Sequence, residues 1–383
     1  MYYLDNAATT RPYKEVVSIV QKSLEIDFAN PSSVHPAGMK ARKLINESRE
    51  TLAKIFSVPQ AGILFCGSGT ESDNLAIKGI LLQKYRYQPE FITNRLEHAA
   101  ISKTAEWLEE KGSPVHYVDF DSATGQIDIN HLLSLINENT RLISIQHVNS
   151  ETGVIQDLKT ISRKVKQKNA NVLIHSDGVQ AFSKFPIDLN DLGVDLYSIS
   201  GHKFRGIKGA GALILTSKQN PVIQIHGGGQ EHGFRSGTEN VPGIAALALA
   251  AKLSHEQMTS DFKKVADFRE KFTNRLKATF SNIRIYHSEN AIPHILSLSF
   301  PGVLGEILLN HLAMKEIYVS TGSACNASSK KLSATLQALG FSQNQIKETI
   351  RISLNANEIP NDFEDFFEKF KSTIIELKTL LKK

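Results

Sequence analysis

Residues 172–216 read VLIHSDGVQAFSKFPIDLNDLGVDLYSISGHKFRGIKGAGALILT and contain three short β-rich runs, at 172–177, 195–200 and 211–216. Runs of this kind alternate with longer segments of helical period through the first two thirds of the chain. That alternation is typical of an α/β layer with a mostly parallel central sheet. Four earlier runs belong to the same series: AGILFC at 61–66, EFIT at 90–93, VHYVDF at 115–120 and RLISIQHV at 141–148.

The segments between these runs predict helices that cross from one strand to the next. Glu71 to Tyr85 and Ala99 to Glu110 are two examples, and their lengths suit crossover connections. In such sheets, ligands bind at the carboxyl ends of the strands. We therefore expect the loops that follow Cys66, Asp177 and Ser200 to converge on one site.

The pattern changes after about residue 255, which predicts a second, smaller domain. A length of 383 residues agrees with two domains at roughly 150 residues each. The later part of the chain predicts a charged helix at 255–279, strands near IRIYH (283–287), ILSLSF (295–300) and IYVS (317–320), and a long final helix.

The final helix carries a stripe of aromatic residues. Its apolar positions recur at helical spacing and share one face, which indicates core packing rather than a cofactor-binding face. The stripe consists of Phe363, Phe366, Phe367, Phe370 and Ile374.

Composition and charge exclude several classes of protein. Hydrophobic residues make up 41% of the chain and charged residues 22%, which is ordinary globular usage and excludes disordered, collagen-like and coiled-coil proteins. The formal net charge is +5, but the charges are scattered rather than gathered in a basic stripe. We therefore expect no direct contact with nucleic acid.

Cysteine usage and the lack of targeting signals favour a soluble, cytoplasmic protein with no membrane contact. Cys66 and Cys325 form no C-x-x-C motif, so neither a disulfide framework nor a cysteine-rich zinc site is expected, and no metal is predicted. The amino terminus has no basic segment followed by an apolar one. The longest apolar stretch, 244–251, falls well short of the roughly 18 residues that a membrane-spanning helix needs.

A glycine-rich turn after the first run is a candidate anion site. Residues 65–74 read FCGSGTESDN, so a strand passes through the turn into a helix with Glu71 in its first turn. The N–H groups at a helix amino terminus attract an anion such as phosphate. By itself the segment also fits an ordinary Gly-Ser loop that caps a helix.

Asp177 and Lys203 follow two of the predicted strands. Asp177 ends an apolar run, where an unpaired buried carboxylate would be costly. A protonated ring nitrogen would offset that cost, and a simple turn cap is the alternative. A partly desolvated lysine beside other cations can act as a nucleophile or base, although most lysines do neither. The glycines after Lys203 do not match the dinucleotide-binding spacing.

Two polar loops are further candidates. The loop HGGGQEHGFRSGTEN (226–240) is typical of a functional segment, and its Arg235 and Thr238 could reach a phosphate or carboxylate. A solvated surface loop is the alternative. The loop STGSACNASSKK (320–331) places Cys325 among small residues, which indicates a reactive thiol. Cys66 ends an apolar strand, and we expect it to be structural.

Taken in order, these segments resemble the NifS-type cysteine desulfurases of the class V aminotransferase group, which are pyridoxal-phosphate enzymes of fold type I. The likeness covers nearly the whole chain, and its ordered set of motifs is highly specific. The motifs are YLDNAATT (3–10), NPSSVH (30–35), GTESDN (69–74), LEH (96–98), HSDGVQ (175–180), SGHK (200–203), RSGTEN (235–240), GSAC (322–325) and RISL (351–354).

The resemblance implies a large domain with a mostly parallel seven-stranded sheet and a smaller α+β carboxyl-terminal domain. Residues 1–15 would pack with the small domain, and residues 16–255 would form the large, cofactor-binding domain. Residues 256–383 would form the small domain and carry the loop with the catalytic cysteine.

The same resemblance implies the cofactor site. Lys203 matches the lysine that holds pyridoxal 5'-phosphate covalently, and Asp177 matches the carboxylate that keeps the ring nitrogen protonated, which makes the ring an electron sink. His98 matches the imidazole that stacks on the ring and helps to transfer protons. Gln180 matches a contact to the ring hydroxyl.

Further matches imply the phosphate and substrate contacts. Arg351 matches the arginine that forks onto the substrate carboxylate. Thr238 matches a phosphate contact that comes from the second subunit, so a homodimer is implied. The other phosphate contacts match Gly69, Thr70, Ser200 and His202.

The implied activity converts L-cysteine to L-alanine. Cys325 would take the substrate sulfur as a persulfide and pass it to an acceptor protein, such as an iron–sulfur scaffold or a protein of tRNA thiolation. The GSAC context resembles group I of the family, which has the longer mobile loop. A selenocysteine lyase, a class V aminotransferase and a non-catalytic sulfur-relay adaptor are the alternatives.

The sequence departs from the family pattern at three places. Ser150 stands where the family commonly has the asparagine that contacts the ring hydroxyl, so that contact would be shorter or water-mediated, or Asn149 would replace it. The glycine turn reads CGSGT rather than the usual T-S-G-x-T. Asn355, Ala356 and Asn357 follow RISL where Gly-Arg is usual.

Overall fold

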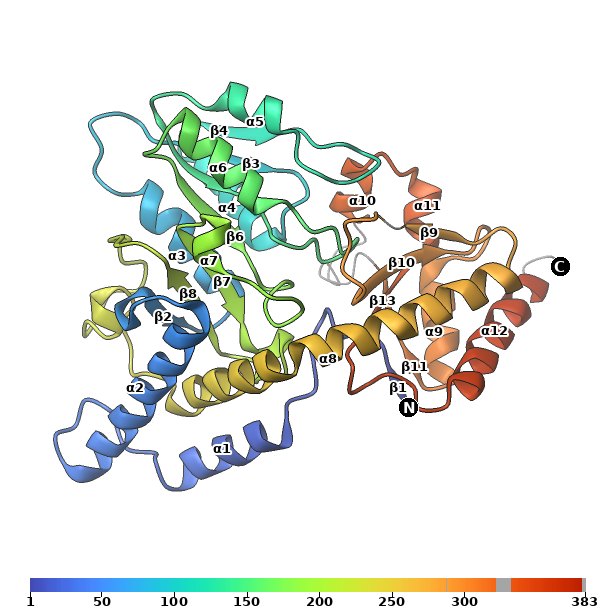
Figure 1. Cartoon of the computed structure of the whole chain (residues 1–383), viewed down its shortest axis with the longest axis horizontal. Coiled ribbons are helices and arrows are strands. Elements are labelled where there is room, and N and C mark those ends of the chain that lie inside the picture. The colour runs from blue at the N-terminus through green and yellow to red at the C-terminus, as the bar shows by residue number, and fades with distance from the viewer. Residues whose placement is uncertain (287, 322–331, 381–383) are drawn as a thin grey trace.

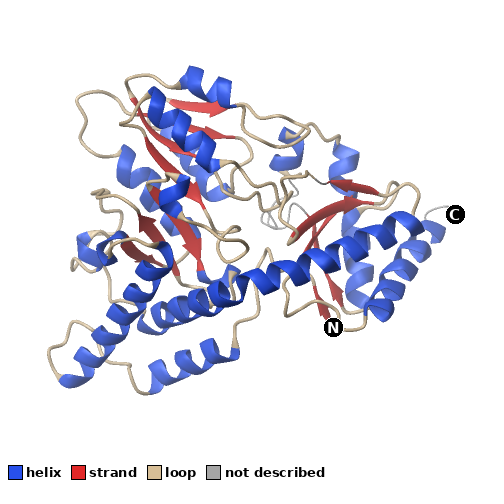
Figure 2. Ribbon diagram, viewed as in Figure 1, coloured by secondary structure: helices blue, strands red, loops and turns tan. Residues whose placement is uncertain are grey.

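The computed structural model describes residues 1–286, 288–321 and 332–380, and its larger body is built on a seven-stranded sheet (Figures 1 and 2). In spatial order the strands are β2 (Ile63–Cys66), β8 (Gly211–Leu215), β7 (Leu196–Ser200), β6 (Leu173–Asp177), β5 (Thr140–Ser144), β3 (Glu90–Asn94) and β4 (Val115–Val118). β8 is antiparallel to both of its neighbours, and the other pairings are parallel. Each strand overlaps a predicted run, and the mostly parallel sheet is confirmed.

Helices cover both faces of this sheet because side chains alternate between the faces along each strand. In β2, Ile63 and Phe65 join one core, and Leu64 and Cys66 join the other. The first core is closed by α1 (Lys14–Glu25), α2 (Pro36–Phe56), α5 (Ile129–Leu135), α6 (Leu158–Lys168), α7 (Leu189–Leu192) and part of α8 (Val241–Thr279). The second is closed by α3 (Gly69–Leu81) and α4 (Ala99–Glu110).

The two predicted helices of the second core are confirmed, although α3 begins at Gly69, two residues before the predicted start, and also ends early. α4 has the predicted bounds, whereas α3 ends at Leu81, before the predicted Tyr85. The hydroxyl of Tyr85 donates a hydrogen bond to the carbonyl of Ile80 at 2.9 Å. A side chain thus satisfies a carbonyl that a longer helix would have paired.

The smaller body contains a four-stranded antiparallel sheet, and α8 joins it to the larger body (Figure 1). In spatial order this sheet is β12 (Ser320–Thr321), β13 (Thr349–Ser353), β10 (Ile295–Ser299) and β9 (Arg284–Tyr286). β1 (Tyr2–Tyr3) pairs with β11 (Ile317–Tyr318) beside it. The helices of this body are α9 (Gly305–Met314), α10 (Ala334–Ala338), α11 (Gln343–Glu348) and α12 (Phe363–Leu380).

α8 contributes to the cores of both bodies. Ile244 and Leu247, near its start, pack in the large core, whereas Phe268 and Phe272 pack in the small one. The helix runs without a break through residue 255, where the change of sequence pattern places the domain boundary. The division at that residue stays a prediction. Among the described residues, no helix has the length and apolarity needed to span a bilayer.

The aromatic stripe of α12 fills the core of the smaller body. Phe363, Phe366, Phe367, Phe370 and Ile374 are all buried. Phe272 of α8 lies 5.4 Å from Phe366 and 5.3 Å from Phe370, measured between ring centroids. The interpretation of the stripe as core packing is confirmed.

Phe370 offers a test of this packing. The F370A substitution removes a ring that is fully buried, so we expect the free energy of unfolding to fall by about 3–5 kcal/mol. Urea unfolding followed by circular dichroism measures the change. I375A, at a residue of the same helix that is 47% exposed, should change stability by less than about 0.5 kcal/mol. Equal effects of the two substitutions would contradict the packing described here.

Candidate active site

The turns after β2, β6 and β7 meet at one edge of the seven-stranded sheet. A Cβ atom built on Gly69, at the start of α3, would lie 2.7 Å from Cγ2 of Val179 and 3.4 Å from Cβ of Ser200. Only glycine fits at this position without displacing a neighbour. The predicted convergence of the loops after Cys66, Asp177 and Ser200 is confirmed.

The amino terminus of α3 forms one wall of this edge. Ser68 caps the helix by accepting a hydrogen bond from the N–H of Glu71 at 3.1 Å. Glu71 in turn accepts from the N–H of Gly67 and from Nε of Arg235, both at 2.9 Å. Arg235 is therefore paired with Glu71. The N–H groups of Gly69 and Thr70, in the first turn of α3, have no carbonyl acceptor within the helix. The backbone N–H groups of Gly69 and Thr70 are therefore better candidates than Arg235 to donate hydrogen bonds to a bound anion.

Lys203 lies on a short 3-10 helix after β7, η2 (Gly201–Lys203), where it meets the amino-terminal segment. Its Nζ atom donates to the carbonyls of Ala7 at 2.6 Å and Ala8 at 3.0 Å. Nε2 of Gln180 donates to the same Ala7 carbonyl at 2.9 Å. The sequence motif YLDNAATT thus lies against two of the predicted cofactor residues.

His202 is neutral at pH 7. Burial, together with the charges of Lys203 and Lys208, lowers its pKa to about 4. A hydrogen bond of 3.2 Å joins its Nδ1 to the hydroxyl of Thr9. A neutral imidazole can still donate from one ring nitrogen.

Asp177 ends β6 as a buried carboxylate. Its Oδ1 accepts from the N–H of Val179 at 2.9 Å, so the turn cap named as an alternative is present. Burial raises the pKa of Asp177, and the nearby charges of His98 and Lys203 lower it. Asp177 therefore interacts electrostatically with the histidine and the lysine with which the motifs group it.

A layer of buried polar side chains lies beneath Asp177, and sequence reasoning missed it. His175 is fully buried, and its ring nitrogens meet the hydroxyls of Ser144 at 2.9 Å and Ser198 at 3.0 Å. Burial lowers the pKa of His175 to about 3, so the ring is neutral. Oδ1 of Asp73 lies 3.6 Å from His175, and burial together with the charge of Asp177 raises the pKa of Asp73. The only signal in the sequence is the polar residues within apolar runs, as in IHSD and YSIS.

His98 stands at the amino end of α4 and borders a cleft. Its Nδ1 accepts from the N–H of Ala100 at 3.1 Å, which places the ring hydrogen on Nε2 in the neutral form. Residues from both bodies line the cleft, among them Asn94, His98, Ser150, Glu151, Ser333 and Arg351.

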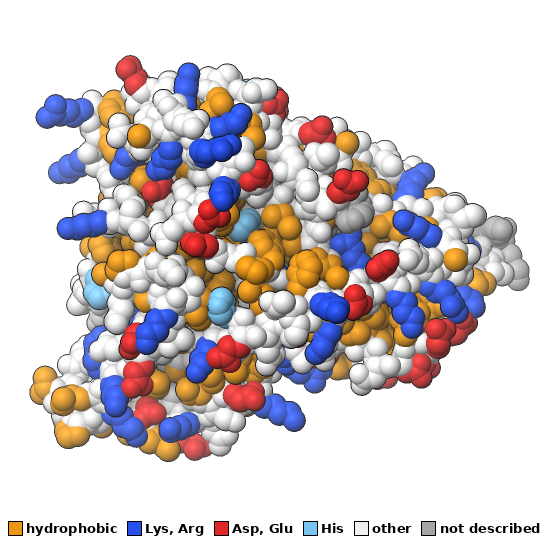
Figure 3. Space-filling view, in the orientation of Figure 1, with side chains coloured by type: hydrophobic (Ala, Val, Ile, Leu, Met, Phe, Trp, Pro, Cys, Tyr) orange, Lys and Arg blue, Asp and Glu red, His pale blue; other side chains and the backbone are white. Residues whose placement is uncertain are grey.

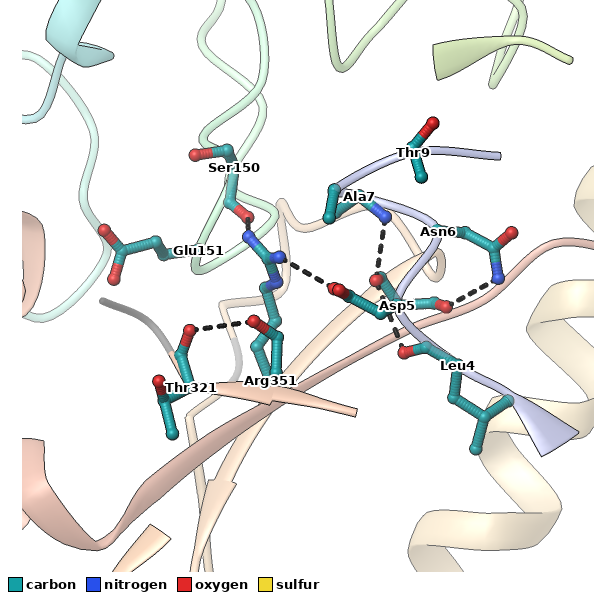
Figure 4. A network of polar contacts seen from close by, with 12 residues as sticks. Leu4, Asp5, Asn6, Ala7, Thr9, Ser150, Glu151, Thr321 and Arg351 are labelled. Carbon is teal, nitrogen blue, oxygen red and sulfur yellow. Dashed lines mark hydrogen bonds and ion pairs between the residues drawn. The ribbon is translucent and has the colours of Figure 1, made fainter. Parts of the chain in front are cut away.

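Arg351 projects from β13 into this cleft, although only 2% of its surface is exposed (Figure 4). Its Nη1 donates to the carbonyl of Ser150 and its Nη2 to Oδ1 of Asp5, each at 3.0 Å. Asp5 belongs to a quoted motif but had no predicted role. The pair joins residues 346 positions apart, which no local pattern reveals.

The structure favours one of the two residues, Asn149 and Ser150, that could contact the ring hydroxyl where the family commonly has an asparagine. Oδ1 of Asn149 accepts from the N–H groups of Glu151 and Thr152 at 2.9 and 2.8 Å, and Nδ2 donates to the carbonyl of Leu96 at 3.1 Å. Asn149 is buried and shapes the turn. Ser150 lines the cleft and is the better candidate for a ring-hydroxyl contact.

Of the predicted site residues, His98, Ser150 and Arg351 line the cleft, whereas Lys203 and Asp177 lie at the sheet edge and are not part of the cleft lining. Thr238 belongs to neither group. Thr238 is exposed and borders a separate hollow with Leu24 and Phe28. Cys325 lies outside the described residues. The segment that contains it is flanked by described residues at the cleft: Ser320 pairs with Arg351, and the hydroxyl of Ser333 donates to Glu151 at 2.5 Å.

Cys66 behaves as the structural cysteine that its position predicts. It is buried in the core between the sheet and α3. Burial raises the pKa of its thiol to about 12, so the reactive thiolate form is suppressed at neutral pH.

Comparisons with known proteins show the family of this chain. Residues 2–366 match the family described as aminotransferase class-V. The chain belongs to the cysteine desulfurases of that family. It is 35% identical over 379 residues to a protein of Dictyoglomus turgidum named cysteine desulfurase IscS, covering 99% of this chain and 95% of that one. A protein of the same name from Buchnera aphidicola is 38% identical, with 99% and 94% covered.

Solved structures show the same fold. One titled NifS-like protein superposes with a TM-score of 0.92 at 34% identity, covering 98% of this chain and all of that chain. Another, titled SspA in complex with cysteine, has a TM-score of 0.81 at 31% identity, with 92% and 99% covered. The desulfurase described here is therefore an enzyme with the family's α/β fold, and the family is pyridoxal-phosphate-dependent.

Glu97, next to His98 in the LEH motif, generates a pH-dependent prediction. Its Oε1 accepts from Nδ2 of Asn94 at 2.6 Å and from the N–H of Gln146 at 2.7 Å, but burial raises its pKa from 4.5 to about 8. The unfolded chain thus loses this proton at lower pH than the folded chain. The stability contributed by the protonated carboxyl is complete below about pH 4.5 and is lost as the pH rises toward 8.

We expect E97Q to remove this dependence. The free energy of unfolding of the wild type, minus that of E97Q, should fall by about 3 kcal/mol between about pH 5 and pH 8. Urea unfolding at several pH values measures the difference. E110Q, at the exposed far end of α4, serves as the control and should follow the wild type. A difference between wild type and E97Q that is constant with pH would contradict the assigned protonation.

Proposed function

We propose that this desulfurase binds pyridoxal 5'-phosphate through Lys203 and uses it to remove sulfur from L-cysteine. The observation that carries the proposal is the meeting of three groups at one sheet edge: the Lys203 amine, the buried Asp177 carboxylate and the amino terminus of α3. The cradle at Gly69, where a Cβ would lie 2.7 Å from Val179, fits a bound anion that approaches the backbone closely.

Each neighbouring residue receives a role from its position. Asp177 would pair with the protonated ring nitrogen, which would offset the cost of burying its charge. Gln180 and Ser150 would contact the ring hydroxyl, and His98 would stack on the ring. The phosphate would be held by Gly69, Thr70, Ser200 and His202, with Thr238 supplied by the second subunit.

The chain's own residues would then carry out the sulfur transfer. When bound, pyridoxal phosphate supplies an electron sink for the electron pair of the substrate α-carbon. Arg351 would hold the substrate carboxylate, and Nζ of Lys203 or the ring of His98 would move the α-proton. The Cys325 thiolate would attack the substrate sulfur, the carbon–sulfur bond would break with its electron pair going to carbon, and protonation there would yield alanine. The transferred sulfur would remain as a persulfide on Cys325.

The choice of L-cysteine as substrate rests on two supports. Curated relatives are named cysteine desulfurases, and a solved relative is titled as a complex with cysteine. The persulfide would pass in the cytoplasm to an acceptor protein, such as an iron–sulfur scaffold or a protein of tRNA thiolation. The described residues on either side of the segment with Cys325 contact residues of the cleft: Ser320 pairs with Arg351, and Ser333 donates to Glu151.

The two cysteines provide a matched test. C325S should keep the cofactor absorbance but release no sulfide from L-cysteine, because the attacking thiolate is gone. C66S should retain sulfide release, because that thiol is buried in the core. Alanine and sulfide are measured after adding L-cysteine, and the persulfide is mapped by mass spectrometry. Normal turnover by C325S would overturn the proposed mechanism.

We also propose a homodimer, formed through the face of α1 and α2. Apolar side chains gather at the lower left of Figure 3, over these helices. Val34 is 92% exposed, Phe28 75% and Met39 62%, and contiguous exposed apolar side chains mark interaction surfaces. Thr238 borders a hollow that Phe28 also lines. A second subunit docked on this face would therefore contact Thr238, the residue proposed to complete the phosphate site of that second subunit.

Phe28 tests this arrangement. F28D would bury a charge in the interface, so light scattering should report half the wild-type mass, and pyridoxal phosphate should dissociate at least about ten-fold more readily. M314D changes another apolar residue, 82% exposed on α9, and should leave both mass and cofactor affinity unchanged. A dimeric F28D protein with normal cofactor affinity would exclude this interface.

A further inference from the structure

Arg351, which lines the cleft, pairs with a carboxylate that the proposed reaction does not use. Asp5 reaches Arg351 from the amino-terminal segment, and its Oδ1 accepts from Nη2 at 3.0 Å (Figure 4). Arg351 is almost fully buried, and a buried cation without a partner would strongly destabilise the protein. Asp5 therefore neutralises the group to which the substrate carboxylate is expected to bind.

The contact between Asp5 and Arg351 is incomplete. Nη1 of Arg351 is used by the carbonyl of Ser150, and among the described residues its buried Nε has no hydrogen-bond partner. A carboxylate that binds a guanidinium through both oxygens uses two adjacent N–H groups. The guanidinium offers two such pairs, Nε with Nη2 and Nη1 with Nη2. Both pairs include Nη2, the nitrogen that donates to Asp5. A substrate carboxylate can thus bind through two oxygens only by taking over or sharing the Asp5 contact.

The backbone around Asp5 is anchored independently of its side chain. The N–H of Asn6 donates to the carbonyl of Ser353 at 3.2 Å, and the N–H of Ala7 donates to the hydroxyl of Ser353 at 2.8 Å. The N–H of Thr10 donates to the carbonyl of His202 at 2.9 Å. The Asp5 side chain can therefore leave Arg351 by rotation about its own bonds while the segment stays in place.

We propose that Asp5 is an internal competitor of the substrate carboxylate for Arg351 and thereby sets the affinity for amino-acid substrate and product. The proposal rests on the proposed role of Arg351. In the resting enzyme Asp5 neutralises the buried guanidinium. When the α-carboxylate arrives, the two like charges repel, and Asp5 gives up Nη2. The competition weakens substrate binding but speeds the release of alanine, which carries the same carboxylate.

The holoenzyme tests the competition directly. D5N keeps the shape of the side chain but removes its charge, so the Kd for L-alanine, followed by cofactor absorbance, should fall about ten-fold. The KM for L-cysteine should fall with it, while kcat stays equal or falls because alanine leaves more slowly. E358Q is the matched control, because Glu358 pairs with Arg11 of the same segment at 2.9 Å without touching Arg351. A Kd for L-alanine in D5N that equals or exceeds that of the wild type would overturn the proposal.

A second measurement needs no cofactor. In the cofactor-free chain, D5A should unfold at lower temperature than the wild type, and propionate should restore several degrees of that loss by occupying the place of Asp5. Propionate should not stabilise the wild type, or the double variant D5A/R351Q, at the same concentration. Failure of propionate to stabilise D5A would overturn the competition. Failure of the wild-type holoenzyme to form alanine from L-cysteine would instead overturn the proposed function and leave this measurement standing.

Discussion

Burial of ionisable side chains at the edge of the seven-stranded sheet and in the adjoining cleft is the constraint on which the rest of this structure depends. A buried charge destabilises a fold unless a partner or a set of hydrogen bonds compensates it. Lys203 is compensated by carbonyls of the amino-terminal segment, Arg351 by Asp5 and a carbonyl of the large body, and Asp177 by a turn N–H and nearby positive charge. The partners come from distant parts of the chain. The contacts that compensate these charges therefore also bring the residues of the site together.

Two elements connect the bodies that supply those partners. α8 packs in both cores, which ties the position of the small sheet to that of the large one (Figure 1). The amino-terminal segment starts in β1 beside β11, hydrogen-bonds to Ser353 of β13 and then reaches His202, where the N–H of Thr10 donates to its carbonyl at 2.9 Å. The cleft between the bodies is therefore bordered by groups whose spacing these two connections maintain.

Much of the fold follows from local pattern. Most strands of the large sheet are visible as apolar runs because they are buried on both faces, although the edge strand β4 is only half-buried. The turns after β2, β6 and β7 converge because these parallel strands end at the same edge. The ends of elements are less visible. α3 stops early, and the Ile80 carbonyl near its end accepts from the Tyr85 hydroxyl and from the N–H of Gln83. α8 continues through residue 255, and its two halves pack in different cores. From the sequence alone, either Asn149 or Ser150 could contact the ring hydroxyl. Because the Asn149 side chain is used by hydrogen bonds within its own turn, Ser150 is the better candidate.

The residue types of the site, including Lys203, Asp177, His98 and Arg351, could be singled out from their motifs, because each motif is a short, contiguous signature. The pairing of Asp5 with Arg351, the layer of Asp73 and His175 beneath Asp177, and the contact between Glu151 and Ser333 required the folded chain. Periodicity and spacing report which face of its own helix or strand a side chain occupies. They carry no information on which distant element will lie opposite that face, and the electrostatics of this site arise from those long-range contacts.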